Sequence, residues 1–119
     1  MMKTILVIED DEAILEVVKD ILENEGFNVF TFNKLPTVDE ITGLNCHLII
    51  SDHRLRDGFG GELCSRLKRN PVTKAIPFIL FSANADIGQI AAKNCTDAFI
   101  AKPFEIFHLL TLVQHFTCL

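Results

Sequence analysis

Short apolar runs recur along the chain at the spacing of buried strands. The run at residues 3–8 is rich in β-branched side chains and stops abruptly at four consecutive acids. Continuous apolar runs of this kind are typical of strands covered on both faces of a parallel sheet. The same pattern predicts five strands in all, at residues 3–8, 27–32, 46–51, 76–81 and 97–101.

Between the predicted strands, apolar residues recur at helical spacing. The clearest set spans residues 14–22, for which Asp11 is the expected N-cap and Gly26 the expected end. Four further helices are expected, at residues 35–44, 61–69, 86–93 and 105–116, the first of them opened by Pro36. Strands that alternate with helices indicate an α/β fold, in which a five-stranded parallel sheet carries five helices on its two faces.

Polar side chains directly follow four of the predicted strands. Glu9 and Asp10 follow the first strand, Asp52 the third, Ser82 the fourth and Lys102 the fifth. In open α/β sheets, ligands bind in the crevice beyond the carboxyl ends of the strands. We therefore expect these five side chains to lie along one functional edge of the sheet.

Three carboxylates in one crevice repel one another unless a cation neutralises them. Mg²⁺ suits such a set, because it takes a few carboxylate oxygens, keeps several waters and leaves room for a phosphate oxygen. Lys102 adds a positive charge to this edge and Ser82 adds a hydroxyl donor. These groups suit phosphoryl transfer onto the carboxylate of Asp52. The nearby Asp11 is expected to cap the first helix rather than to bind the metal.

Four segments carry a resemblance to a known family. They read ILVIEDD at residues 5–11, LIISD at 48–52, FSA at 81–83 and AKPF at 101–104. In this order, each with an apolar run, they make the chain similar to the receiver domain of two-component response regulators. This family has the CheY-like, flavodoxin-like fold, and the resemblance covers essentially all of residues 1–119. It implies that Asp52 accepts a phosphoryl group from a phosphohistidine on a sensor histidine kinase or phosphotransfer protein.

The resemblance also implies a ligand set for the metal. Asp10 and Asp52 would bind Mg²⁺ directly, together with the backbone carbonyl of Arg54, and Glu9 would hold a metal-bound water. No other cofactor is expected. Ser82 would be the switch hydroxyl that moves toward the phosphoryl group.

Further roles follow from the same resemblance. Lys102 would be the counter-ion of the phosphoryl group, and its bond to Pro103 would be cis. Phe99 falls at the aromatic switch position. Arg54 and Asn84 occupy the two variable positions that tune the lifetime of the phosphoryl group.

The loop after Asp52 departs from the family pattern at one position. Arg56 stands where the family usually has a proline, while the expected glycine is present as Gly60. We therefore expect the loop to keep its path. In the same region, His53 is expected to be a partly exposed neutral histidine pointing away from Asp52, and Asp57 to serve the turn.

Length, charge and cysteine content limit the number of domains, the partners and the compartment that are expected for this chain. The chain has 119 residues, of which 49% are hydrophobic, and this size predicts one domain. Because the resemblance covers residues 1–119, it implies that this domain is the receiver and that no output domain is expected. A net charge of -5 disfavours nonspecific attraction to nucleic acid or to anionic membranes, and no run approaches the ~20 apolar residues of a membrane span. The four cysteines lack zinc-ligand spacing, so we expect them to be buried and reduced in a cytoplasmic protein.

The predicted last helix is apolar over a wider arc than one sheet contact needs. Residues 86–93 are also poor in charge, so excess apolar surface is expected on the last two helices. Such surface favours a protein partner, either a downstream target or a second copy of the chain.

Two other functions compete with the phosphorylation-switched receiver. One is a phosphorylation-independent interaction module, a pseudo-receiver, which would be expected to lack the acceptor, an acid or the lysine. The other is a small phosphatase with an aspartyl nucleophile, which would usually carry a second aspartate where Arg54 stands. The residues present favour the receiver, a regulatory phosphoacceptor rather than an enzyme.

Overall fold

The computed structural model describes residues 2–118 and is built around a five-stranded parallel sheet, as predicted. The strand order across the sheet is β2-β1-β3-β6-β7. Its strands are β1 (Thr4–Ile8), β2 (Asn28–Phe32), β3 (Leu48–Asp52), β6 (Phe78–Ser82) and β7 (Ala98–Ala101). The predicted strands therefore form the sheet, with ends that differ from the predicted ones by no more than two residues.

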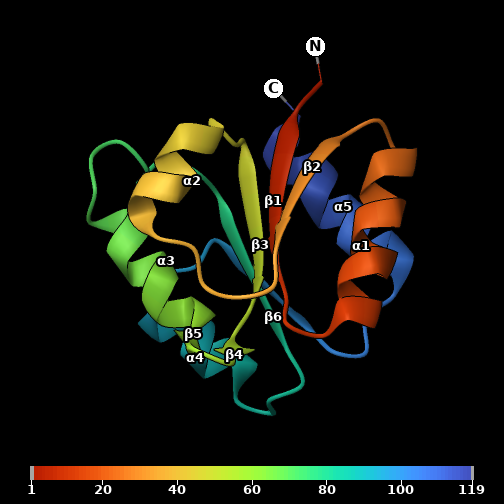
Figure 1. Cartoon of the computed structure of the whole chain (residues 1–119). Helices are drawn as coiled ribbons and strands as arrows, with labels where there is room; N and C mark the ends of the chain where they lie inside the picture. Colours follow the sequence, from red (N-terminus) through yellow and green to blue (C-terminus); the bar gives the residue numbers. More distant parts are fainter. Residues whose placement is uncertain (1, 119) are drawn as a thin grey trace.

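Helices cover both faces of the sheet, in agreement with the predicted α/β fold. Helices α2, α3 and α4 lie on one face, and α1 and α5 lie on the other (Figure 1). Their bounds are α1 (Glu12–Asn24), α2 (Val38–Leu44), α3 (Gly60–Lys68), α4 (Ile87–Lys93) and α5 (Ile106–Thr117). In residues 2–118, none of the helices has the length and apolar character needed to cross a bilayer.

The core consists of two apolar clusters separated by the sheet. Alternate residues of β1 and β3 point to opposite faces of the sheet, and Leu6 and Ile49 pack against α2, α3 and α4. Ile5 and Ile50 point the other way and pack under α1 and α5. Each such side chain is fully buried, which contributes about 1.5–3 kcal/mol relative to exposure. The central strands are thus held rigidly from both sides.

The first helix begins and ends where the sequence predicts. Asp11 Oδ1 accepts hydrogen bonds from the backbone nitrogens of Ala13 at 3.0 Å and Ile14 at 3.2 Å, which caps α1. The helix ends before Gly26, whose φ of +91° is in the range that glycine tolerates best. The side chain of Asp11 is therefore used by the helix.

The second helix begins later than predicted. Pro36 lies outside it, and Thr37 is its N-cap. Thr37 Oγ1 accepts from the backbone nitrogen of Glu40 at 3.1 Å, and Glu40 Oε1 accepts from that of Thr37 at 3.0 Å. This reciprocal pair satisfies two free donors at the helix start and sets the boundary.

Two other expectations need correction. The segment expected to be a loop after β3 contains a short antiparallel hairpin, formed by β4 (Arg54–Leu55) and β5 (Gly58–Phe59). Of the four cysteines, all are free, but Cys95 and Cys118 are exposed rather than buried. The Lys102–Pro103 bond is cis, as the family resemblance implied.

Gly60 is the glycine that the fold can least replace. A Cβ atom there would collide with the carbonyl oxygen of Asp52 and lie 2.7 Å from Ser51 Oγ. We expect Gly60→Ala to lower the free energy of unfolding by about 1–3 kcal/mol, as overpacking does. Urea denaturation followed by circular dichroism measures this change.

Gly43→Ala is the matched control, because a Cβ atom on that helical residue would meet no atom within 4 Å. It should raise the free energy of unfolding by about 0.5–1 kcal/mol through helix propensity. A Gly60→Ala protein as stable as the wild type would contradict the close approach to Asp52.

Candidate functional site

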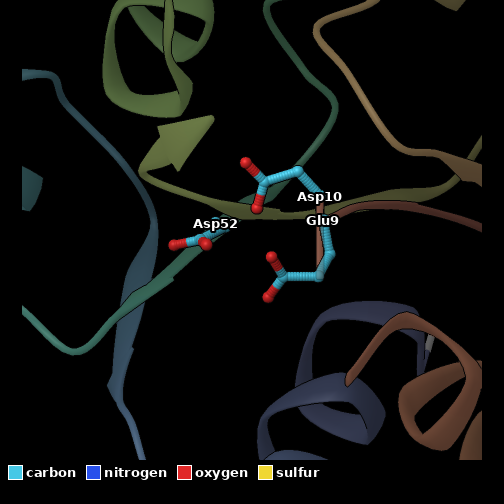
Figure 2. Close-up of side chains that lie close together, drawn as sticks. All are labelled: Glu9, Asp10 and Asp52. Carbon is cyan, nitrogen blue, oxygen red and sulfur yellow. The ribbon is translucent and has the colours of Figure 1, made fainter. Parts of the chain in front are cut away.

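Three carboxylates meet where the strand order of the sheet reverses. β1 lies between β2 and β3, so the ends of β1 and β3 are adjacent at the reversal point. Glu9 and Asp10 directly follow β1, and Asp52 is the last residue of β3. One oxygen of each carboxylate lies within 4.8 Å of the others, and Figure 2 shows the three side chains gathered at this edge. The structure therefore brings together the acids that the sequence singled out.

Lys102 reaches the same point from the end of β7. Its Nζ lies 2.6 Å from Glu9 Oε1 and 3.1 Å from Asp52 Oδ2. The ammonium also lies 4.8 Å from the centre of the Phe81 ring, within reach of a cation–π contact. A backbone hydrogen bond from Lys102 N to Ser82 O, 2.9 Å long, aligns the end of β7 with that of β6. One cation thus bridges two acids that are distant in sequence.

The buried acid and the lysine shift each other's protonation. Burial raises the pKa of Glu9 to about 7, although the hydrogen bonds from Lys102 and from Asp11 N oppose the rise. The negative charge of Asp52 adds to it. Burial alone would lower the pKa of Lys102, but its hydrogen bond to Glu9 and the charge of Asp52 outweigh that effect and raise it. Lys102 is therefore firmly charged.

The donor set fits a divalent cation. Three carboxylates face one ammonium, so the ionised cluster carries two uncompensated negative charges. Carboxylate oxygens are hard ligands of the kind that Mg²⁺ and similar cations take. Asp11, the third acid of the run, points its carboxylate at the start of α1 instead. The residues that can hold a metal ion here are Glu9, Asp10 and Asp52.

A cavity of about 470 Å³ opens beside Asp52 and is large enough for a phosphoryl group. It is lined by Asp52, Arg54, Ser82, Ala83, Asn84 and Lys102. Ser82 is buried, and its Oγ accepts a hydrogen bond from the backbone nitrogen of Asn84 at 3.1 Å. Its hydroxyl proton is not used in that bond and is free for a ligand. Arg54 is exposed at the rim.

Phe99 lies away from the acids, on a different surface. Its side chain is 45% exposed and packs near Gly88 of α4. It lines a separate groove of about 380 Å³ between α4 and α5, together with His108 and Leu112. Phe99 thus lies beside the last two helices and apart from the acid cluster.

The surroundings of His53 were not anticipated from the sequence. Its Nδ1 accepts a hydrogen bond from the backbone nitrogen of Gly61 at 3.2 Å, and its ring stacks on Phe59 with centres 5.1 Å apart. Burial lowers the pKa of His53, which favours the neutral ring needed for this acceptor. Asp57 also makes a contact beyond its own turn, because its Oδ1 accepts from Leu35 N at 3.1 Å. The stack could have been inferred from the sequence, because His53 and Phe59 are aromatic residues at the two ends of the hairpin segment.

Known proteins match this chain along most of its length. The phosphate regulon transcriptional regulatory protein PhoB of Rhizobium meliloti is 31% identical over 117 residues, covering 96% of this chain and 52% of that protein. The polar-differentiation response regulator DivK of Brucella anthropi is 26% identical over 120 residues, covering 98% and 97%. The chain covers nearly all of DivK, but it spans only about half the length of PhoB and of several other curated relatives that it matches.

Solved structures agree with these relatives. A CheY-like response regulator receiver domain protein from Methanospirillum hungatei has a TM-score of 0.87 at 27% identity, over 97% of this chain and 93% of that one. The signal receiver domain of a signal transduction histidine kinase from Syntrophus aciditrophicus has a TM-score of 0.86 at 28% identity, over 96% and 89%. A family model described as the response regulator receiver domain matches residues 5–114. This chain belongs to that family, the receiver domains of two-component response regulators.

Proposed function

We propose that this receiver is switched by phosphorylation of Asp52 in a reaction that requires Mg²⁺. The phosphoryl donor is the phosphohistidine of a sensor histidine kinase or phosphotransfer protein. The observation that carries the proposal is the cluster of Glu9, Asp10 and Asp52 with the Lys102 ammonium 3.1 Å from Asp52. An acid that lies beside both a cation and a possible metal site is well placed to attack phosphorus.

The transfer forms one bond and breaks one. An oxygen of the Asp52 carboxylate bonds to phosphorus while the bond from phosphorus to the donor imidazole nitrogen breaks, and its electron pair stays on that nitrogen. Lys102 Nζ and the Ser82 hydroxyl each hold a phosphoryl oxygen from the cavity wall. Mg²⁺, held by Asp10, Asp52 and the Arg54 carbonyl with Glu9 nearby, would supply the remaining neutralisation of charge.

The output is proposed to leave through the last two helices. Ser82 moves toward the phosphoryl group, and Phe99 reorients beside α4 and α5. α5 exposes Ile106 and Phe107, the latter to 82%, which is unusual for an apolar side chain without a partner. A downstream protein or a second copy of the chain would cover this surface.

The lifetime of the phosphoryl group is proposed to depend on Arg54 and Asn84. Both line the cavity beside Asp52, so their side chains can affect the approach of water. The domain acts as a regulatory phosphoacceptor that assists only its own phosphorylation and dephosphorylation. A cytoplasmic location fits the four free cysteines, because reduced thiols are typical of that compartment.

Phosphorylation by a small acyl phosphate tests the proposal. With acetyl phosphate and Mg²⁺, the wild-type protein should gain one phosphoryl group by intact-mass spectrometry, and Asp52→Asn should gain none. Asp57→Asn is the matched control, because Asp57 lies in the same segment and asparagine keeps the Oδ1 atom that accepts from Leu35 N, so this variant should gain one group. No gain by folded wild type would favour the pseudo-receiver, and steady release of phosphate from many monoesters would favour the phosphatase.

Removing one acid should change both stability and the response to Mg²⁺. Without metal, Asp10→Asn should raise the free energy of unfolding by about 1 kcal/mol, because it relieves repulsion within the cluster. Mg²⁺ should stabilise the wild type by binding the folded state and should have little effect on Asp10→Asn. Thermal unfolding with and without Mg²⁺ measures both changes.

Asp11→Asn serves as the control for the neighbouring acid, because asparagine caps a helix as well as aspartate does. It should keep the Mg²⁺ response of the wild type. An Asp10→Asn protein that is still stabilised by Mg²⁺ would contradict the assignment of the metal ligands.

A further inference from the structure

Helix α3 begins without a capping side chain of its own. Its N-cap is Phe59, whose side chain makes no capping hydrogen bond. The first backbone N–H groups of a helix have no partner within the helix and need acceptors from elsewhere. His53 supplies two of them: its carbonyl oxygen accepts from Gly60 N at 2.7 Å, and its Nδ1 accepts from Gly61 N at 3.2 Å.

The same histidine closes the base of the hairpin. His53 directly precedes β4, and its ring stacks on Phe59, the last residue of β5, at an interplanar angle of 28°. Arg54 pairs with Phe59 across the hairpin. Arg54 is therefore held between the His53 ring stack on one side and the buried Leu55, which is 7% exposed, on the other.

Apart from His53, the hairpin is anchored by Leu55, which packs in the core, and by a contact at its tip. At its tip, Asp57 Oδ1 accepts from Leu35 N at 3.1 Å, and no proline stiffens the turn because Arg56 occupies that position. The path of the backbone next to Asp52 thus depends on the contacts of His53 at the base, on the buried Leu55 and on the contact of Asp57 at the tip.

We propose that His53 is a positioning residue of the metal site. By capping α3 and closing the hairpin, it fixes the backbone of Arg54 beside Asp52, where the carbonyl of Arg54 can serve as a ligand. This inference rests on the proposed function, since it takes Mg²⁺ as the ion bound by the acid cluster. His53 does not contact the ion itself; it acts through Arg54.

Magnesium binding to the full chain, measured by isothermal titration calorimetry, tests this role. His53→Ala removes both the stack and the ring acceptor, and we expect the dissociation constant for Mg²⁺ to rise about ten-fold, as for other residues that orient metal ligands. His53→Asn places an amide oxygen near the position of Nδ1 and should recover most of the affinity. Phe59→Ala, which removes the stack alone, should weaken binding less than His53→Ala.

His47→Ala is the matched control. His47 Nδ1 also accepts a backbone hydrogen bond, from Thr4 N at 3.0 Å, but just before β3 begins, far from the acid cluster. His47→Ala should lose stability without a change in the dissociation constant for Mg²⁺. This comparison separates positioning of the metal site from general destabilisation.

The outcomes distinguish the inference from the proposed function. An unchanged dissociation constant in folded His53→Ala, or an equal rise in His47→Ala, would overturn the positioning role while the wild type still binds Mg²⁺. If His53→Ala does not fold, the two milder variants decide. The positioning role is then overturned if both His53→Asn and Phe59→Ala keep the wild-type dissociation constant for Mg²⁺ and the wild-type reaction with acyl phosphate. Graded losses of Mg²⁺ affinity in these two variants support it. A folded wild type that binds no Mg²⁺ would overturn the proposed function and this inference together.

Discussion

Electrostatic repulsion among Glu9, Asp10 and Asp52 is the constraint on which the site depends. The sheet holds the three carboxylates within 4.8 Å because both strands that present them are buried on both faces. Lys102 compensates for part of the repulsion by contacting two of the acids. The remaining negative charge is costly without a cation and makes the site a strong candidate for a divalent metal. The cluster thus lowers the stability of the fold and places these carboxylates where they can do chemistry.

The fold delivers these groups through strand register rather than through local motifs. Ile8 pairs with Ser51, and Ser82 pairs with Ala101, so the residues that follow or end these strands come level at one edge. The reversal of strand order at β1 places this edge where ligands bind in open α/β sheets. The cavity beside Asp52 follows from this arrangement, and the cis bond at Lys102–Pro103 lies directly at its border.

The sequence predicted the central strands and the convergence of their polar ends, because a strand buried on both faces is continuously apolar. It did not predict the hairpin at β4 and β5, whose stability comes from contacts such as His53 with Phe59 and Asp57 with Leu35. Those contacts join segments whose composition alone predicts a loop. The start of α2 was misplaced because Pro36 was preferred over the capping pair of Thr37 and Glu40, although that pair is visible in the sequence. The exposure of Cys95 likewise depends on its place after α4, which composition does not encode.

A crystal structure of the protein with Mg²⁺ and beryllium trifluoride, a mimic of the phosphoryl group, tests the central claim most directly. The predicted result is a metal ion bound by Asp10, Asp52 and the Arg54 carbonyl, with the beryllium bonded to Asp52 and its fluorine atoms contacted by Lys102 and Ser82. A metal ion bound elsewhere, or beryllium trifluoride absent from Asp52 in crystals grown with both reagents, would contradict it.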